Sequence, residues 1–276
     1  MIALRTPAAA KINLALVVGP RRPDGLHELA SVVQRVDLCD RLELVPGERF
    51  AVTGFAGDTL VTAALRELAR VAEVEPSWRV ELRKSIPVGA GLGGGSADAA
   101  AALVLANRTL QTPLDAAELA HVAASIGSDV PFFLAPGPKL VGGAGELLTP
   151  LELPQDFWVL LVRDPKERKE STGAVYARFD ELDGPTGFAT RRLQLAEALA
   201  AVRRPRDLAS LPPNDLARAA GGAPLAQRLL AAGAFRADLS GAGPTTYGLF
   251  HHRTDAESAA AALPRGVRGK IVAPVW

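Results

Sequence analysis

The chain has 276 residues, of which 48% are hydrophobic and 22% charged, as in ordinary globular proteins with room for two modest domains. Its 31 basic and 30 acidic side chains leave a net charge of +1, so no basic surplus indicates a nucleic-acid partner. No leader is evident, no apolar run reaches the roughly 18 residues of a membrane span, and the single cysteine, Cys39, cannot form an intramolecular disulfide. We expect a soluble, cytoplasmic protein.

The first periodic stretch is residues 5–18, where polar and apolar residues alternate and predict a strand. Lys11 and Asn13 point together from one face of this strand, beside small residues that leave space around them. For an isolated pair of this kind, a solvent-facing position is the default interpretation.

A turn and two further elements follow. Asp24-Gly25 is a strong turn signal, and we expect His27 after it to be exposed. Residues 31–44 predict strands around a turn, and residues 59–73 have the apolar spacing of a helix that packs on a core.

The most distinctive stretch runs from Pro87 to Asp98 and carries five glycines between Gly89 and Gly95. The residues before it alternate as a strand, and the alanine-rich run after it favours a helix capped by Ser96 or Asp98. Backbone N–H groups approach an anion closely only where no Cβ intervenes, and a helix N-terminus adds unpaired donors. The sequence therefore predicts a phosphate-binding loop.

Two common phosphate loops fit this stretch poorly. It lacks the Gly-Lys-Ser/Thr ending of a P-loop. Gly89 to Gly94 formally fits the dinucleotide fingerprint GxGxxG, but Asp115, the acidic residue near the required distance, opens a helical stretch instead of ending a strand. A nicotinamide dehydrogenase is thus a weak alternative.

Further along the chain, residues 114–126 predict an amphipathic helix closed by Gly127. Asp129 is expected to cap a new helix that has Pro131 in its first turn. In the second half, residues 158–162 predict a buried strand, and another glycine-rich turn lies at the start of residues 239–250.

Several of these segments together resemble the GHMP family of small-molecule kinases. The glycine loop is similar to the family's second motif, a proline followed by a Gly-Leu-Gly-rich loop with a serine that opens a helix. The run Pro-Ala-Ala-Ala-Lys11-Ile-Asn13-Leu resembles the first motif, and residues 239–250 resemble the third. One departure is Ala97, where many relatives carry a second serine.

The resemblance implies an α+β fold of two domains. Residues 1–152 would form an ATP-binding and catalytic domain like domain 2 of ribosomal protein S5, and residues 153–276 a ferredoxin-like substrate-binding domain. The implied activity is that of an ATP-dependent kinase with an alcohol acceptor, which uses ATP and Mg²⁺. The implied ATP-binding residues are Pro87, Gly89, Gly91, Leu92, Gly93, Gly94, Gly95 and Ser96.

The resemblance also implies catalytic roles. The Gly-Ser-Asp-Val-Pro segment resembles one whose aspartate is the proposed base of one branch of the family, which gives Asp129 that role. Lys11 would keep this carboxylate ionised and stabilise charge on the reacting oxygens. No set of Mg²⁺ ligands can be assigned.

The Asp-Gly-Leu-His segment resembles a loop that recognises a cytosine base in the same branch, whose substrate is a cytidylyl alcohol. His27 would contact the base, with Leu26 in place of a stacking tyrosine, and Tyr176 would supply a second ring. Asn214-Asp-Leu resembles another segment of that branch, without an assigned role. The implied substrate-binding residues are Asn13, Leu26, His27, Thr172, Tyr176, Ser240 and Gly241.

Alternatives remain open at this point. A GHMP kinase of the homoserine or mevalonate type would lack the need for a cytidyl group. A non-catalytic nucleotide- or RNA-binding module, suggested by the S5-like fold, is disfavoured by the near-neutral charge. For the favoured kinase we expect a small-molecule substrate, no nucleic-acid or membrane partner, and a monomer or weak homodimer.

Overall fold

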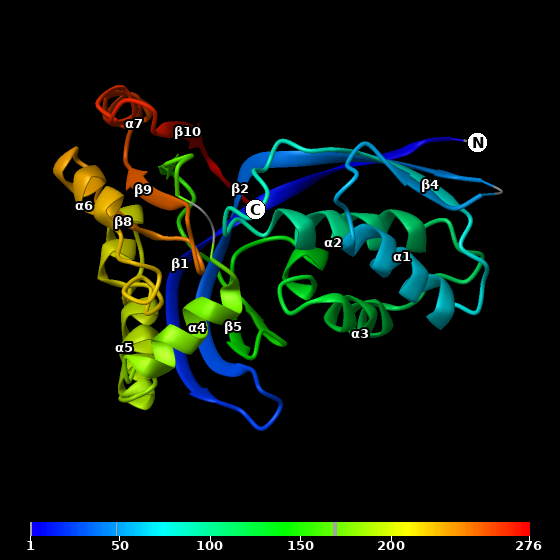
Figure 1. Cartoon of the computed structure of the whole chain (residues 1–276), viewed down its shortest axis with the longest axis horizontal. Helices are drawn as coiled ribbons and strands as arrows, with labels where there is room; N and C mark the ends of the chain where they lie inside the picture. Colours follow the sequence, from blue (N-terminus) through cyan, green and yellow to red (C-terminus); the bar gives the residue numbers. More distant parts are fainter. Residues whose placement is uncertain (1, 48, 168–169) are drawn as a thin grey trace. The chain divides into compact units, whose positions relative to one another are not determined.

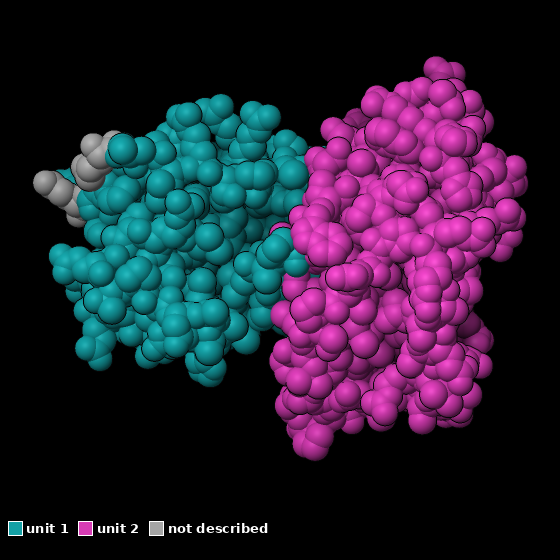
Figure 2. Space-filling model, turned by 180° about the vertical axis from the view of Figure 1, so that it is seen from behind, with its two compact units in different colours: residues 1–10, 38–88, 93–136 teal, residues 11–37, 89–92, 137–276 magenta. Residues whose placement is uncertain are grey.

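The computed structural model describes residues 2–47, 49–167 and 170–276. They form two compact units, each assembled from separate segments of the chain (Figure 2). The first unit takes in residues 1–10, 38–88 and 93–136, and the second takes in residues 11–37, 89–92 and 137–276. The domains expected at residues 1–152 and 153–276 stay a prediction.

Two long paired strands, β1 (Leu4–Arg21) and β2 (His27–Pro46), contribute residues to both units. The expectation of a turn within residues 31–44 is wrong, because β2 runs through this stretch without interruption. Both of its aspartates have partners that suit a strand. Asp37 accepts a hydrogen bond from the backbone of Ala273, and Asp40 accepts two from the chain just before the glycine loop.

In the first unit, the C-terminal half of β2 pairs antiparallel with β4 (Trp78–Arg83), and β3 (Ala51–Thr53) pairs parallel with β4. Alternate residues of β4 are buried, as its sequence pattern predicts, with Trp78, Val80 and Leu82 facing the core. Three helices gather on one side of these strands (Figure 1): α1 (Leu60–Val71), α2 (Gly94–Asn107) and α3 (Ala116–Ile126).

These helices agree with the spacing of their sequences. The apolar face of α1 is buried, and α2 is buried on nearly all sides because its alanines let neighbouring elements approach closely. Asp115 caps α3 in a capping box with Glu118, so this aspartate has a structural role. A short 3₁₀ helix, η1 (Pro131–Leu134), follows it.

In the second unit, the N-terminal half of β2 pairs with β5 (Lys139–Gly143), which pairs with β6 (Leu147–Pro150), and β11 (Pro274–Val275) also pairs with β2. A separate antiparallel sheet has the order β10-β7-β9-β8. Its strands are β7 (Trp158–Arg163), β8 (Arg236–Leu239), β9 (Thr246–Phe250) and β10 (Arg268–Val272).

Two apolar cores hold the helices of the second unit. Helices α6 (Pro224–Ala231) and α7 (Arg253–Ala261) pack on the second sheet around Leu160, Leu229 and Phe250. Helix α4 (Thr172–Glu181) packs on β1 instead, with Val175 and Phe179 against Leu16 and Val18. The remaining helical segments are α5 (Phe188–Ala201) and the 3₁₀ helix η2 (Pro205–Ser210). Among the described residues, no helix is both long and apolar enough to cross a membrane.

Candidate active site

Lys11 and Asn13 open a chain of hydrogen bonds in the second unit. Lys11 Nζ donates to Asn13 Oδ1 at 2.9 Å, and Asn13 Nδ2 donates to Ser31 Oγ of β2 at 2.8 Å. The Ser31 hydroxyl donates in turn to the carbonyl of Ala15 at 2.7 Å. Lys11 is only 7% exposed and Asn13 5%, so the default interpretation of a solvent-facing pair is wrong. These polar side chains can be buried because they form hydrogen bonds with one another.

The two glycine loops touch through their backbones beside this pair. A Cβ added at Gly91 would lie 2.5 Å from the carbonyl oxygen of Ser240, and its φ of +76° also favours glycine. The Ser240 hydroxyl donates to the carbonyl of Gly91 at 3.0 Å, and the backbone N–H of Lys11 donates to that of Leu92 at 2.9 Å.

Gly241 of the second glycine turn also lies beside Lys11 and Asn13. A Cβ there would lie 3.5 Å from Asn13 Oδ1 and 3.8 Å from Lys11 Nζ. The structure thus brings together residues of all three motifs that the sequence places far apart: Lys11, Asn13, Gly91, Ser240 and Gly241.

His27 lies at the start of β2 and is covered by α4. Its Nε2 is 2.8 Å from Asp180 Oδ1, and its ring centroid is 4.9 Å from that of Tyr176, with the planes tilted by 38°. The expectation of an exposed histidine is wrong, since only 9% of His27 is accessible. The sequence pattern could not show that a helix about 150 residues away packs over it.

Asp180 is a residue that the sequence analysis missed. Thr172, Tyr176 and Asp180 follow one another at intervals of four along α4, so all three belong to one face of the helix. Extending this spacing from the predicted Thr172 and Tyr176 would have found it. Thr172 itself is exposed at the first helical position, and Leu26 is 53% exposed in the loop before His27.

The glycine loop leads directly into α2, which belongs to the first unit. The helix begins at Gly94, and Gly93 precedes it in the left-handed conformation at φ +68°. The expected cap by Ser96 or Asp98 is wrong, because Ser96 lies within the first turn and Asp98 lies beyond it, and within the described chain no side chain caps this helix. Its first N–H groups are therefore not engaged by a cap, as a phosphate site requires.

Asp98 instead forms a buried ionic cluster with Lys84 and Asp40. Lys84 Nζ is 2.5 Å from Asp98 Oδ2 and also donates to Asp40. Asp40 accepts the backbone N–H groups of Ser85 and Ile86, which fixes the turn before the glycine loop. Burial raises the pKa of Asp98 to about 7, although Lys84 opposes this shift.

Asp129 is exposed in the turn before η1. The expectation that it caps this helix is wrong: Val130 stands at the cap position with helical torsion angles, and within the described chain no side chain caps η1. Helical geometry thus continues through Val130 into Pro131 without the extended residue that a capping side chain needs.

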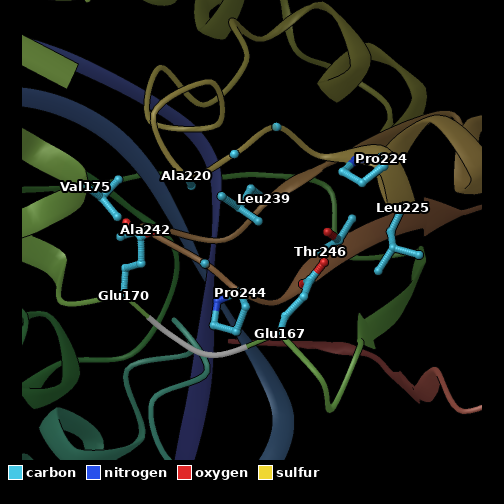
Figure 3. A pocket seen from close by; sticks show the side chains of 13 residues that line it. Glu167, Glu170, Val175, Ala220, Pro224, Leu225, Leu239, Ala242, Pro244 and Thr246 are labelled. Carbon is cyan, nitrogen blue, oxygen red and sulfur yellow. The ribbon is translucent and has the colours of Figure 1, made fainter. Parts of the chain in front are cut away.

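The second unit also holds a pocket of about 300 Å³ (Figure 3). Part of its lining is Ala242, Gly243 and Pro244 of the second glycine turn, and Val175 of α4 lines it as well. Glu167 and Glu170 add two carboxylates, of which Glu170 is paired with Arg178 at 2.8 Å.

Two family models and several known proteins match this chain. The family model described as GHMP kinases N terminal domain matches residues 59–137, and that described as GHMP kinases C terminal matches residues 223–269. The chain is 41% identical to a protein from Salinispora arenicola, over 94% of this chain and 87% of that protein. It is 38% identical to one from an Anaeromyxobacter species, over 96% of this chain and 88% of that protein.

The chain therefore belongs to the GHMP kinase family, and the predicted α+β fold and kinase class are confirmed. Both relatives are 4-diphosphocytidyl-2-C-methyl-D-erythritol kinases. A crystal structure of 4-(cytidine 5'-diphospho)-2C-methyl-D-erythritol kinase matches with a TM-score of 0.80 at 32% identity, over 99% of this chain and 100% of that one. A homoserine kinase from Cytophaga hutchinsonii shares the fold, with a TM-score of 0.71 at 16% identity over 99% and 95% of the two chains.

The raised pKa of Asp98 predicts a pH-dependent stability. Between about pH 4 and pH 7 the folded protein keeps a proton that the unfolded chain releases, so the free energy of unfolding falls as pH rises through this window. Asp98→Asn cannot ionise. Relative to the unmodified protein, its free energy of unfolding should rise from pH 5 to pH 7 by up to about 1.4 kcal/mol per unit, apart from a constant loss of the Lys84 contact.

Urea unfolding of both proteins at pH 5, 6, 7 and 8 measures this difference. Asp156→Asn, at an exposed aspartate, is the control and should show no such trend. A difference for Asp98→Asn that does not vary with pH would contradict the assignment.

Proposed function

We propose that the chain transfers the γ-phosphoryl group of ATP to the C2 hydroxyl of 4-diphosphocytidyl-2-C-methyl-D-erythritol, in the non-mevalonate (methylerythritol phosphate) route to isoprenoid precursors. The observation that carries the proposal is the cluster of His27, Tyr176 and Asp180, which suits a cytosine base. Support comes from identities of 36–42% to kinases of that name over most of the chain.

ATP would be held by the loop from Gly91 to Ser96. Its glycines let the backbone approach the phosphates, and the N-terminus of α2 offers N–H donors and a positive dipole end. Pro87 and Gly89 would shape the entry to this loop.

Mg²⁺ fits this arrangement. In kinases it binds mainly to nucleotide phosphates, with one or two protein oxygens and water, so an all-protein cage is not required. The Ser96 hydroxyl in the first turn of α2 is the oxygen that this chain offers in place of the paired serines of many relatives. When bound, the ion would neutralise phosphate charge.

Phosphoryl transfer depends on positioning and charge stabilisation more than on covalent chemistry. We assign Asp129 as the base that accepts the hydroxyl proton and Lys11 as the cation that stabilises charge on the reacting oxygens. The bond from Lys11 Nζ to Asn13 Oδ1 orients the ammonium group, and Asn13 would help to orient the alcohol. Ser240 and Gly241, which touch this pair and the glycine loop, would bound the phosphoryl side.

The base would be recognised by hydrogen bonding and stacking. A carboxylate can only accept, so Nε2 of His27 carries the hydrogen that bonds Asp180. In the neutral ring this leaves Nδ1 as an acceptor, which matches the exocyclic amino group of cytosine. Tyr176 would stack on the base, Leu26 would add an apolar contact and Thr172 a hydroxyl.

A kinase of this metabolic role is expected in the cytoplasm, as a monomer or weak homodimer, without nucleic-acid or membrane partners. The homoserine and mevalonate kinase alternatives are supported only by fold-level likeness, at 12–16% identity. The dehydrogenase and RNA-binding alternatives gain no support from the family that the chain belongs to.

Turnover of ATP by the purified protein with Mg²⁺ tests the proposal. The cytidylyl alcohol, homoserine and mevalonate are compared in parallel. We expect product only with the cytidylyl alcohol, and turnover of one of the others instead would replace the proposed substrate.

Asp129→Asn should lower kcat by a factor of about 10² to 10⁴, because the proton acceptor is lost. The melting temperature should stay nearly constant, since Asp129 is exposed and does not cap η1. Asp115→Ala is the matched control: it removes a true helix cap, should cost about 1 kcal/mol of stability, and should leave kcat unchanged. A lowered melting temperature with unchanged kcat for Asp129→Asn would contradict the catalytic role.

His27→Ala should raise KM for the cytidylyl alcohol at least tenfold, because about 1.4 kcal/mol of base binding is lost. KM for ATP should not change. Leu26→Tyr should lower the alcohol's KM about fivefold, if the added ring contributes about 1 kcal/mol of stacking. Steady-state kinetics with each substrate varied separately gives these values, and equal effects of His27→Ala on both substrates would remove it from base recognition.

A further inference from the structure

The segment from Asn214 to Leu216, between η2 and α6, is buried in the second unit and holds two distant parts of the chain together. Asn214 is 3% exposed, and Leu216 is fully buried in the core that α4 forms with β1. The proposed reaction leaves this segment without a role.

The Asn214 side chain bonds the second glycine turn. Its Nδ2 donates to the carbonyl of Leu239 at 2.9 Å and to that of Gly241 at 2.7 Å. Its Oδ1 accepts the backbone N–H of Leu216 at 2.9 Å, which fixes the orientation of the amide. One side chain thus anchors the turn at two carbonyls.

Asp215 bonds in the other direction, to the strand that carries Lys11 and Asn13. Its backbone N–H donates to the carbonyl of Leu16 at 2.9 Å, and its carboxylate accepts the backbone N–H of Val18 at 2.8 Å. Arg191 donates to the same carboxylate at 3.0 Å. Two consecutive residues therefore connect β1 with the glycine turn.

Packing supports only part of the turn. Ser240 and Gly241 touch the glycine loop and the Lys11–Asn13 pair. The next three residues, Ala242 to Pro244, line the pocket of about 300 Å³ (Figure 3). On the pocket side the turn lacks packing partners, so hydrogen bonds hold its position. The bonds from Asn214 add to those that Gly243 donates to the carbonyl of Ser240 and Thr245 donates to the carbonyl of Ala90.

We propose that Asn214 is a positioning residue for phosphoryl transfer: it holds the turn so that Gly241 lies against Lys11 and Asn13. The identity of the reaction that these positioned groups serve rests on the proposed function. The hydrogen bonds by which Asn214 holds the turn do not depend on that function.

Asn214→Asp tests this with almost no change of shape. A carboxylate cannot donate, so both carbonyls would lose their donor and face a negative charge. Tyr247→Phe is the matched control. It removes a hydroxyl from the same buried region, bonded to Leu14 and Arg236 rather than to the turn.

We expect Asn214→Asp to lower kcat about 100-fold, as small misplacements at reacting groups do, with KM for both substrates changed less than about threefold. Amide hydrogen exchange of residues 240–245 should become at least about tenfold faster. Tyr247→Phe should change neither kcat nor the exchange of this segment. Loss of melting temperature alone, with kcat within about twofold of the unmodified protein, would reduce Asn214 to a structural residue and overturn the proposal.

Asn214→Ser serves if the aspartate variant fails to fold, since its hydroxyl keeps one donor. A fall of kcat of about tenfold or more with faster exchange supports the proposal, and unchanged values overturn it. If the unmodified protein turns over none of the alcohols, the proposed function fails. The exchange rates then still decide whether Asn214 holds the turn.

Discussion

The close approach of Gly91 to Ser240 is the contact on which the arrangement of the second unit's polar groups depends. A Cβ at Gly91 would collide with a carbonyl oxygen at 2.5 Å, so the two loops can meet only backbone to backbone. This contact places Gly241 beside Asn13 and Lys11, and it lets the Ser240 hydroxyl bond the glycine loop. Glycine is thus required for the fit between two segments, in addition to its proposed role in access to phosphate.

The proposed base-recognition residues are held in place by helix packing. On α4, one helix face presents Tyr176 and Asp180 to His27, while the neighbouring face buries Val175 and Phe179 against β1. The same packing that stabilises the helix therefore fixes the polar group. A loop histidine alone would lose conformational entropy on binding a base, whereas His27 is already held by a ring and a carboxylate.

Local patterns in the sequence predicted most elements, because period and capping act over a few residues. The alternation in β4 and the spacing in α1 and α3 agree with the structure. Other features could not be predicted because they depend on long-range contacts. Burial of His27 depends on a helix about 150 residues away, and the pairing of Asp98 with Lys84 and Asp40 joins three segments. The start of α2 was misplaced for a local reason: a left-handed glycine replaced the expected polar cap.

The buried cluster at the start of α2 has a consequence for the proposed nucleotide site. Two carboxylates and one ammonium group carry a net charge of −1 when Asp98 is ionised, which opposes a triphosphate at this helix end. Protonation of Asp98, whose pKa is raised to about 7, removes that charge. Because linkage is reciprocal, a bound triphosphate would raise the pKa of Asp98 further, and nucleotide binding near neutral pH would take up a proton. In the proposed site, the backbone of the glycine loop would supply the donors and Asp98 would adjust the charge.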